Sequence, residues 1–116
     1  ELDNIFLFFP DPWPKKRHHK KRLFSKDFLL LAHHLLKNDG NIYIKTDHDG
    51  LFEWMQDVLN AMENTHFSVV LKSYDLWKEH DDHFLASFQT SFEKLFRRKN
   101  TTIKALVLKK KDHVSK

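Results

Sequence analysis

The feature that most constrains the fold of this chain is the alternation of short apolar runs with longer amphipathic segments. Strand-like runs occur at residues 5–9, 41–46, 67–74 and 103–108, and helix-like segments follow the first three runs. This order is typical of an α/β protein, and it predicts a mostly parallel sheet with helices on both faces. The first run ends at Pro10, and its continuous apolar character predicts a strand that is covered on both faces.

Local signals predict where the helices begin and end. Ser25 is suited to cap a helix, with Phe24 and Leu29 spaced as a hydrophobic staple, and Asn38-Asp39-Gly40 provides a stop. A second helix is expected over residues 49–63 and a short third one over 90–98. The buried face of the second helix is expected to comprise Leu51, Trp54, Met55, Val58 and Met62.

Two aspartates directly follow predicted strands. Asp11 follows the run at 5–9, and Asp47 follows the run at 41–46. Right-handed crossovers bring the carboxyl ends of successive parallel strands to the same edge of a sheet, where α/β proteins bind ligands. We therefore expect Asp11 and Asp47 to be neighbours in one cleft.

The basic residues are concentrated in two places, within a chain of net charge +4 and pI of about 9.3. Six of the 20 lysines and arginines fall within residues 15–22. A second cluster comprises Arg97, Arg98, Lys99, Lys104, Lys109, Lys110 and Lys111. Polyanion binding is the expected role of both clusters, although a solvated surface is the preferred interpretation of the run 109–111.

Composition narrows the class of protein. With 116 residues, 41% of them hydrophobic and 14% aromatic, residues 1–116 are expected to form a single globular domain. The absence of cysteine excludes disulfides, thiolate metal sites and thiol nucleophiles, and it fits a cytoplasmic protein. The longest apolar stretch, residues 28–36, is too short to span a membrane and is interrupted by His33 and His34.

Glycine occurs only at positions 40 and 50, so no glycine-rich turn connects a strand to a helix. Nucleotide-type cofactor sites normally need such a turn. The chain also begins at Glu1 rather than at Met. The missing turn indicates the second half of a cofactor-binding domain, and the start at Glu1 leads us to expect that the true N-terminus is missing.

The segment from Pro10 to Leu23, PDPWPKKRHHKKRL, closely resembles the hallmark of the bacterial tRNA (guanine-N7)-methyltransferase family. Two shorter matches follow in the family's order: Lys45-Thr46-Asp47 and Thr90-Ser91-Phe92-Glu93. The resemblance covers essentially the whole chain but only the C-terminal half of the family's catalytic domain. The chain departs from the family at His48, where Trp or Asn is common, and at Lys21, where Arg is more usual.

The resemblance implies a Rossmann-like class I methyltransferase that transfers a methyl group from S-adenosylmethionine to N7 of a guanine in the tRNA variable loop. It implies that Thr90 and Glu93 help to form the substrate or donor site, and it places Pro10 and Asp11 near the donor. The family's glycine-rich donor loop belongs to the half that is missing here, so the isolated chain is expected to be inactive. Removal of the upstream strands would expose a sheet edge, through which the chain could self-associate.

Each candidate residue has a functional and a structural interpretation. Asp11 is the catalytic candidate and Asp47 the second carboxylate for the guanine, but Asp11 could cap a Pro-rich turn and Asp47 a helix. Trp13 could stack on a flipped base or pack beneath its loop, and Thr90 and Glu93 fit a capping box. His18 could bind the substrate or order the loop. The cations expected to contact tRNA phosphates are Lys15, Lys16, Arg17, Lys20, Lys21 and Arg22.

Three further alternatives follow from the same residues. The cluster His80-Asp81-Asp82-His83 could bind a metal, but a polar loop is the preferred interpretation and no metal site is expected. The chain could be a non-catalytic RNA-binding module that uses residues 15–22. An amino-group methyltransferase would share the Asp-Pro-aromatic turn, but it would have no use for the basic run or for the motif at Thr90 and Glu93.

Overall fold

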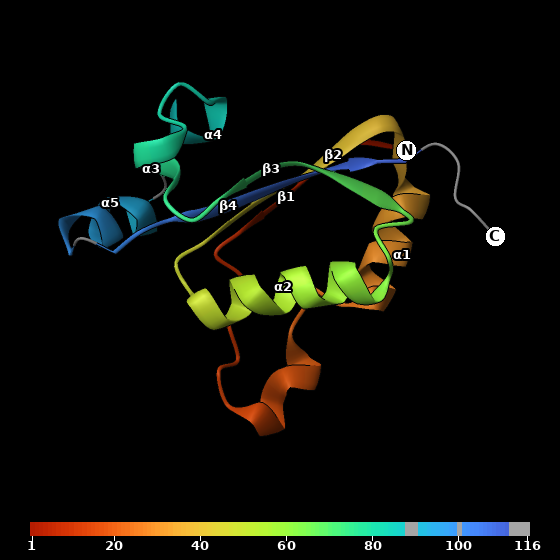
Figure 1. The fold of residues 1–116 in the computed structure, drawn as a ribbon, viewed down its shortest axis with the longest axis horizontal. Coiled ribbons are helices and arrows are strands. Elements are labelled where there is room, and N and C mark those ends of the chain that lie inside the picture. The colour runs from red at the N-terminus through yellow and green to blue at the C-terminus, as the bar shows by residue number, and fades with distance from the viewer. Residues whose placement is uncertain (88–90, 100, 112–116) are drawn as a thin grey trace.

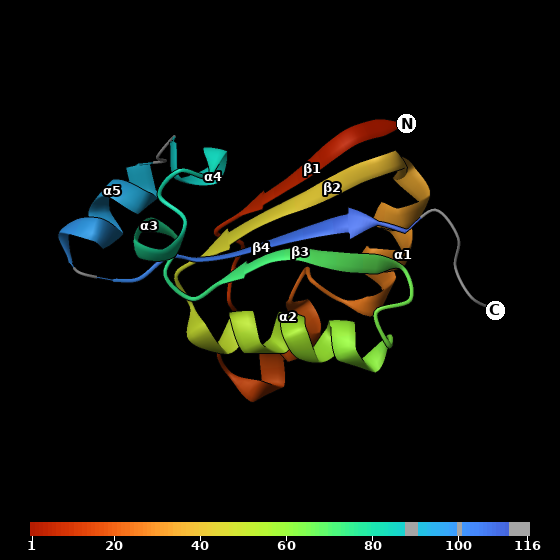
Figure 2. The same cartoon turned by 45° about the horizontal axis from the view of Figure 1, so that its top comes forward.

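The structure is a computed structural model that describes residues 1–87, 91–99 and 101–111. It contains a four-stranded sheet in the order β1-β2-β4-β3, which is clearest in Figure 2. The strands are β1 (Leu2–Phe8), β2 (Leu36–Thr46), β3 (Phe67–Ser73) and β4 (Lys104–Lys110). The helices are η1 (Lys16–Lys21, a 3-10 helix), α1 (Lys26–Leu35), α2 (Asp49–Ala61), α3 (Leu76–Glu79), α4 (Phe84–Ser87) and α5 (Ser91–Arg98).

The sheet is mixed, which corrects the expectation of a mostly parallel one. Strand β1 pairs with β2 in parallel, but β4 lies antiparallel to both of its neighbours, β2 and β3. The reason is the path after β3: α3, α4 and α5 all lie at the end of the sheet where β3 finishes (Figure 1). The chain therefore enters β4 from that end and must run back across the sheet.

Helices cover both faces of the sheet, as expected, but they cover them unevenly. Helices α1 and α2 pack on one face around Ile42, Ile44 and Leu106. On the other face, Leu76 of α3 and Leu85 of α4 pack near the carboxyl ends of β1 and β2 (Figure 1). Strand β1 lies at the sheet edge, and its Phe6 side chain is 54% exposed. The expectation that this strand is covered on both faces is therefore wrong in the described structure.

The helix starts follow the sequence signals closely. Ser25 Oγ accepts a hydrogen bond from the Phe28 amide at 3.1 Å, and Phe24 and Leu29 of the expected staple are buried. Helix α2 starts at Asp49 as predicted, but its capping residue is His48, whose Nδ1 accepts from the Leu51 amide at 2.9 Å. A side chain other than Asp or Ser thus satisfies an amide of the first turn.

The expectation of a helix stop at residues 38–40 is wrong, because α1 already ends at Leu35 and residues 38–40 lie in the irregular first part of β2. Regular pairing with β1 begins where Asn41 lies opposite Asn4, after a register shift. Asp39 has a φ of 67°, and a Cβ on Gly40 would lie 2.9 Å from the Lys37 carbonyl oxygen. Glycine is needed at position 40 because backbone approaches it closely.

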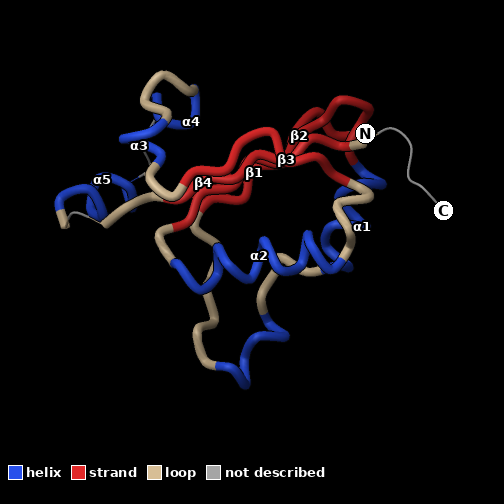
Figure 3. The backbone as a smooth tube through the Cα atoms, in the orientation of Figure 1, coloured by secondary structure: helices blue, strands red, loops and turns tan. Residues whose placement is uncertain are grey.

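Figure 3 shows loops and turns in tan at the two ends of the red strands and, beyond α2, on either side of η1. The connection from β1 to α1 passes α2 and carries η1 (Figure 1). Among the helices in the described ranges, none is both long and apolar enough to cross a membrane.

Candidate functional site

The carboxyl ends of β1 and β2 lie side by side at one edge of the sheet. Phe8 lies opposite Lys45 in the parallel pairing, and the Phe9 amide donates to the Lys45 carbonyl oxygen at 2.8 Å. Asp11 and Asp47 follow these strand ends within three residues. The predicted meeting of the two strand ends is therefore confirmed.

An open pocket of about 290 Å³ lies beside Asp11. Its lining residues are Asp11, Pro12, Trp13 and Pro14, so Asp47 does not line it. We expected one cleft that contains both carboxylates, but this pocket is lined by Asp11 and not by Asp47. Its volume is at the lower end of ligand pockets, which are roughly 300–1,000 Å³, and suits one base-sized group.

The turn that carries Asp11 is bounded by two residues in the left-handed region. Phe9 has a φ of 53° and Trp13 a φ of 42°, which is unusual for bulky side chains. Such strain is concentrated at functional sites, where surrounding contacts hold it in place. Asp11 is exposed, and within residues 1–87, 91–99 and 101–111 its carboxylate makes no hydrogen bond or ion pair. No bond in the described chain therefore supports a capping role for Asp11.

Trp13 is half-buried and forms one wall of this pocket. The Lys21 ammonium lies 4.8 Å from the centroid of the Trp13 ring, and the His18 ring meets it edge-on at 5.6 Å. The Trp13 ring thus packs against its own loop and also lines the pocket, where it remains available to stack on a base.

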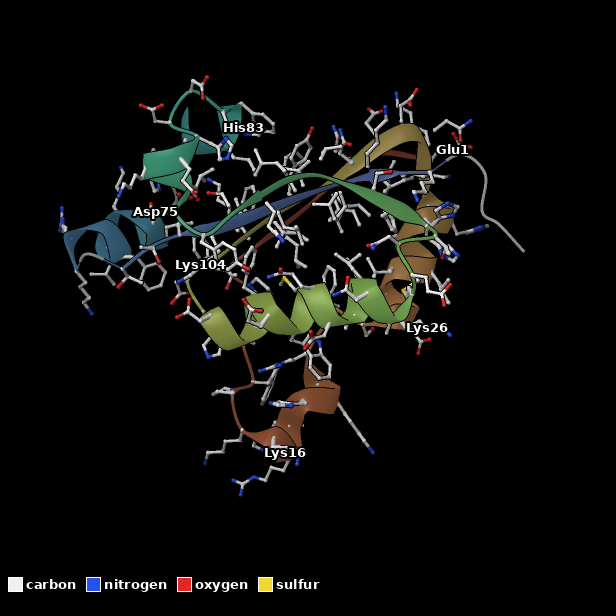
Figure 4. All side chains as sticks on the ribbon, viewed as in Figure 1. Glu1, Lys16, Lys26, Asp75, His83 and Lys104 are labelled. Carbon is white, nitrogen blue, oxygen red and sulfur yellow. The ribbon has the colours of Figure 1, made fainter. Side chains whose placement is uncertain are left out.

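The basic segment 15–22 projects beyond α2, on the side away from the sheet, where Figure 4 labels Lys16. Its exposed cations are Lys15, Lys16, Arg17, Lys20 and Lys21. Trp54 of α2 supports the segment: its ring lies 5.4 Å from the His19 ring, and its Nε1 donates to the Phe24 carbonyl oxygen at 2.9 Å. The segment therefore presents several exposed cations close together, and its position is fixed by contacts with Trp54 of α2.

Arg22 differs from the other cations of this segment. Its side chain is only 6% exposed, and its Nε donates to the Pro12 carbonyl oxygen at 2.8 Å. The guanidinium lies 5.0 Å from the centroid of the Trp54 ring, and burial lowers the pKa of Arg22. In this placement Arg22 closes the loop that carries Asp11, and it is less accessible to a phosphate than the exposed cations of the segment. Sequence reasoning missed this role since Pro12 and Trp54 give no signal of a shared partner.

Asp47 is held through its backbone. The Lys104 ammonium donates to the Asp47 carbonyl oxygen at 3.0 Å and to the Thr102 carbonyl oxygen at 3.3 Å, and it pairs with Asp49 at 2.7 Å. Figure 4 shows Lys104 at the sheet end, next to the start of α2. The Asp47 carboxylate has no hydrogen bond or ion pair in the described ranges, and His48 caps α2 instead. The helix-cap interpretation of Asp47 therefore does not hold.

Glu93 is buried rather than exposed to a ligand. Its Oε1 accepts from the Lys45 ammonium at 2.8 Å, and both side chains are 0% exposed. Thr90, the other half of this motif, lies outside the described residues. The sequence analysis did not select Lys45 as a site residue, and no pattern in the sequence linked it to Glu93.

The lysines of the second basic cluster on β4 and directly after it bond within the chain, whereas Arg98 and Lys99 are exposed at the end of α5. Lys109 pairs with Asp39 at 3.3 Å, and the ammonium groups of Lys110 and Lys111 donate to backbone carbonyls at 2.6 Å. Lys104 is buried. The expectation that this cluster binds a polyanion finds no support in these contacts.

The cluster at 80–83 forms a turn before α4. His83 Nδ1 accepts from the Leu85 amide at 3.1 Å, and burial, followed by the charge of His80, lowers the pKa of His83. Nearby, Glu79 accepts from Ser73 Oγ at 2.6 Å, which is the main cause of its lowered pKa. Across the described ranges, no group of three or more His, Asp or Glu side chains is arranged to hold a metal ion.

Comparison with known proteins agrees with the motif resemblance. Three curated relatives, from Mycoplasma genitalium, Mycoplasma pneumoniae and Halalkalibacterium halodurans, are 43%, 40% and 39% identical to the chain. Each is named tRNA (guanine-N(7)-)-methyltransferase. The matches cover 94%, 94% and 89% of this chain but 50%, 50% and 44% of the relatives, so the chain spans about half of their length.

A family model with the description "Putative methyltransferase" matches residues 1–106. This range contains β1, the Asp11 turn, the basic segment, both buried lysines and α5. The chain therefore belongs to this methyltransferase family.

Proposed function

We propose that this chain supplies the guanine-binding half of an enzyme that transfers a methyl group to N7 of a guanine in tRNA. The observation that carries the proposal is the exposed Asp11 carboxylate, which has no hydrogen bond or ion pair among the described residues and lies in a pocket directly before an exposed basic segment. The relatives' shared name supports tRNA as the substrate, with its guanine in the pocket and its phosphates on the basic surface.

The chemistry of N7 suits such a site. This nitrogen carries an in-plane lone pair and no proton, so no general base is needed to create the nucleophile. Methyl transfer moves positive charge onto the imidazole part of the base. A nearby carboxylate can orient the base and offset that charge. Asp11 can accept hydrogen bonds from N1–H and the N2 amino group of guanine, and both of its oxygens are available because neither has a partner within residues 1–87, 91–99 and 101–111.

The neighbouring residues have distinct roles in this proposal. Trp13 offers an aromatic wall against a base turned out of its stack. Lys15, Lys16, Arg17, Lys20 and Lys21 contact tRNA phosphates, with His18 held between them and Trp13. Asp47 lies at the adjacent strand end, where it can face a second part of the base. Arg22 and Glu93 act within the protein, because their side chains are buried.

The residues present fit only one side of a donor site. S-adenosylmethionine supplies the methyl group when it is bound. Pro10 and Asp11, at the carboxyl end of β1, can contact it there, and the pocket of about 290 Å³ has room for a base but not for both ligands. Gly40 is packed beside β1 and Gly50 lies in the first turn of α2, so neither forms a donor loop. We assign the remaining contacts with the methyl donor to the part of the relatives that this chain does not span.

The test is a chimera in which this chain replaces the matching half of the Mycoplasma genitalium relative. The chimera is incubated with unmodified tRNA and S-adenosylmethionine, and the tRNA is digested to nucleosides for mass spectrometry. We expect 7-methylguanosine, and its loss by at least about 100-fold in Asp11→Asn with little change in the tRNA Kd. Asp57→Asn is the matched control, because Asp57 is exposed on α2 and away from the pocket.

The other outcomes separate the remaining functions. A chimera that binds tRNA in a salt-dependent manner but never methylates it would support an RNA-binding module, which the exposed basic segment favours. Methylation at an amino group would keep the family and overturn the guanine-N7 assignment. Full activity in Asp11→Asn would remove Asp11 from the mechanism.

A further inference from the structure

The further inference concerns the outward side of α5, the helix that lies beside the turn carrying Asp11. The Phe96 ring of α5 lies 5.6 Å from the ring of Phe9, the residue at which that turn begins. Glu93 of the same helix pairs with the buried Lys45, near the end of β2, at 2.8 Å. Figure 1 shows α5 beyond the ends of the strands and η1 beyond α2. Helix α5 is therefore a fixed neighbour of the candidate site.

Three cations lie on the outward side of α5 or directly after it. Lys94, Arg98 and Lys99 are exposed, and their side chains make no hydrogen bond or ion pair among the described residues. The lysines of β4 differ, because their ammonium groups bond to oxygen atoms of the chain. The three cations of α5 are therefore available to an anion outside the chain.

The stability of the helix does not account for this arrangement. Lys94 and Arg98 are four residues apart, so their like charges repel each other along one side of α5. The helix dipole favours cations in the last turn, such as Arg98, but it does not favour Lys94 in the N-terminal half. Lys94 is better explained by an external anionic partner than by the helix itself.

The turn from Phe9 to Trp13 connects this helix with the basic segment. At its start Phe9 contacts Phe96 of α5, and at its end the Trp13 ring lies 4.8 Å from the Lys21 ammonium. Trp13 is four residues after Phe9, so their Cα atoms are at most about 14 Å apart. Asp11 is the middle residue of this turn. The Asp11 pocket thus lies between two neighbours that both carry exposed cations, α5 and the basic segment.

The third group of charges near this end of the sheet is negative. Glu79, Asp81 and Asp82 are exposed at the end of α3 and directly after it. Helices α3 and α4 lie on the face of the sheet opposite α2 (Figure 1). A polyanion is repelled by these carboxylates and attracted by the cations. The charge distribution therefore favours an RNA path that covers the basic segment, the pocket and α5.

We propose that Lys94, Arg98 and Lys99 form a second phosphate-binding surface, so that one tRNA is held on both sides of the Asp11 pocket. Phosphate contacts carry no sequence information, but they fix the position and orientation of the nucleic acid. A second contact on the same RNA forms within an already bound complex, which raises the overall affinity. The inference rests on the proposed function for the identity of the RNA, but binding can be measured without methyl transfer.

The first experiment measures tRNA binding to the chimera with Lys94, Arg98 and Lys99 changed together to Gln. Gln is a good helix former, so α5 should remain folded. We expect the tRNA Kd to rise by about 10-fold and the log–log salt dependence to become shallower by about 2–3 units. Fluorescence anisotropy over a salt series measures both quantities. A variant that binds tRNA like the wild type throughout the series would overturn the inference.

Two controls separate a local surface from net charge and from a change in the helix. Lys37, Lys72 and Lys109 changed to Gln remove the same formal charge from exposed sites elsewhere. This control should change the Kd by less than about twofold, because salt screens charges that are far from the RNA. In the second control, lysine and arginine are exchanged for each other at the three α5 positions, and wild-type binding is expected. An equal loss of affinity in either control would overturn the inference.

The second experiment is hydroxyl-radical footprinting of tRNA bound to the chimera. The α5 variant should lose protection of a backbone segment that stays protected when Lys15, Lys16 and Lys20 are changed to Ala. Loss of one and the same segment in both variants would overturn the assignment of two separate surfaces.

The outcomes distinguish this inference from the proposed function. A wild-type chimera that binds tRNA but forms no 7-methylguanosine would contradict the proposed function, and the footprints would still decide the inference. Normal methylation with an unchanged footprint in the α5 variant would overturn the inference alone. A wild-type chimera that does not bind tRNA would overturn both.

Discussion

Two lysine-rich regions that look alike in the sequence differ in the structure: one is exposed, and the other bonds to the same chain. In residues 15–22, five of the six lysines and arginines are exposed on η1 or directly before it, in a segment that stands away from the sheet. In β4 and the residue after it, Lys104, Lys109, Lys110 and Lys111 all bond to oxygen atoms of the same chain. Among the described residues, the first region therefore presents more exposed cations to a phosphate backbone than β4 and Lys111 do.

The difference comes from the element on which each region lies. The segment 15–22 follows three prolines that fix φ, and its 3-10 helix contacts the rest of the chain mainly through Trp54. Strand β4 is the third strand of four, so its neighbours bring carbonyl oxygens and carboxylates within reach of every lysine. Charge density therefore indicates a binding surface only where few backbone acceptors lie nearby.

Substitution of Arg22 should have the largest effect on stability. Arg22 belongs to the first region but, like the lysines of β4, it bonds within the chain. Arg22→Met removes a charged hydrogen bond to the Pro12 carbonyl and a stacked contact with Trp54. We expect the free energy of unfolding to fall by about 2–4 kcal/mol. Chemical denaturation measures this change, and Lys20→Met, an exposed neighbour, is the control. A stable Arg22→Met variant that binds tRNA poorly would return Arg22 to the phosphate-binding set.

Lys104→Met should have the next largest effect. The substitution leaves the carbonyl oxygens of Asp47 and Thr102 without this donor, and it breaks a pair with the exposed Asp49. We expect a loss of about 1–3 kcal/mol in unfolding free energy, mostly from the carbonyl groups. Denaturation of the variant beside Lys72→Met, a change on the exposed part of β3, measures it. An unchanged stability would mean that water replaces Lys104 at these oxygens.

The exposed cations should affect binding and leave stability alone. We expect Lys15, Lys16 and Lys20, changed together to Ala, to weaken tRNA binding by about 10–100-fold. The log–log dependence of affinity on salt should become shallower by about 2–3 units, because each phosphate contact contributes roughly 0.7–0.9. Fluorescence anisotropy over a salt series measures both quantities.

The matched control for this triple variant changes Lys37, Lys72 and Lys109 to Ala, which removes the same formal charge from other exposed sites. Equal losses in the two triple variants would show that net charge alone attracts tRNA. The contrast between the two basic regions would then have no functional meaning.

Much of the fold could be predicted from the sequence because its signals are local. The Ser25 cap acts within one turn of its helix, and the strand preceding Asp47 ends at Thr46, as predicted. The meeting of the β1 and β2 ends followed from the handedness of a single crossover. The direction of β4 did not follow, because it depends on three short helices that return the chain to the same sheet end.

The site was only partly predictable for the same reason. Asp11 and Asp47 could be selected from their positions after strands, whereas the partners of Arg22, Lys104 and Lys45 come from distant parts of the chain. Glu93 shows the limit most clearly, since its motif suggested a ligand contact and its burial indicates an ion pair. A motif identifies which residues are required, but the contacts decide whether a residue acts on the substrate or on the fold.

Substitution of Lys109 should have the smallest effect on stability and tRNA binding, although this lysine lies on β4 like Lys104. Its pair with Asp39 joins side chains that are 48% and 74% exposed, so solvent screens the attraction. We expect Lys109→Ala to change the unfolding free energy by less than about 0.5 kcal/mol and the tRNA Kd by less than about twofold. A double-mutant cycle with Asp39→Ala measures the coupling directly. A clear loss of tRNA affinity in Lys109→Ala alone would extend the RNA-binding surface to this strand, and the distinction between the two regions would then rest on Lys104, Lys110 and Lys111 alone.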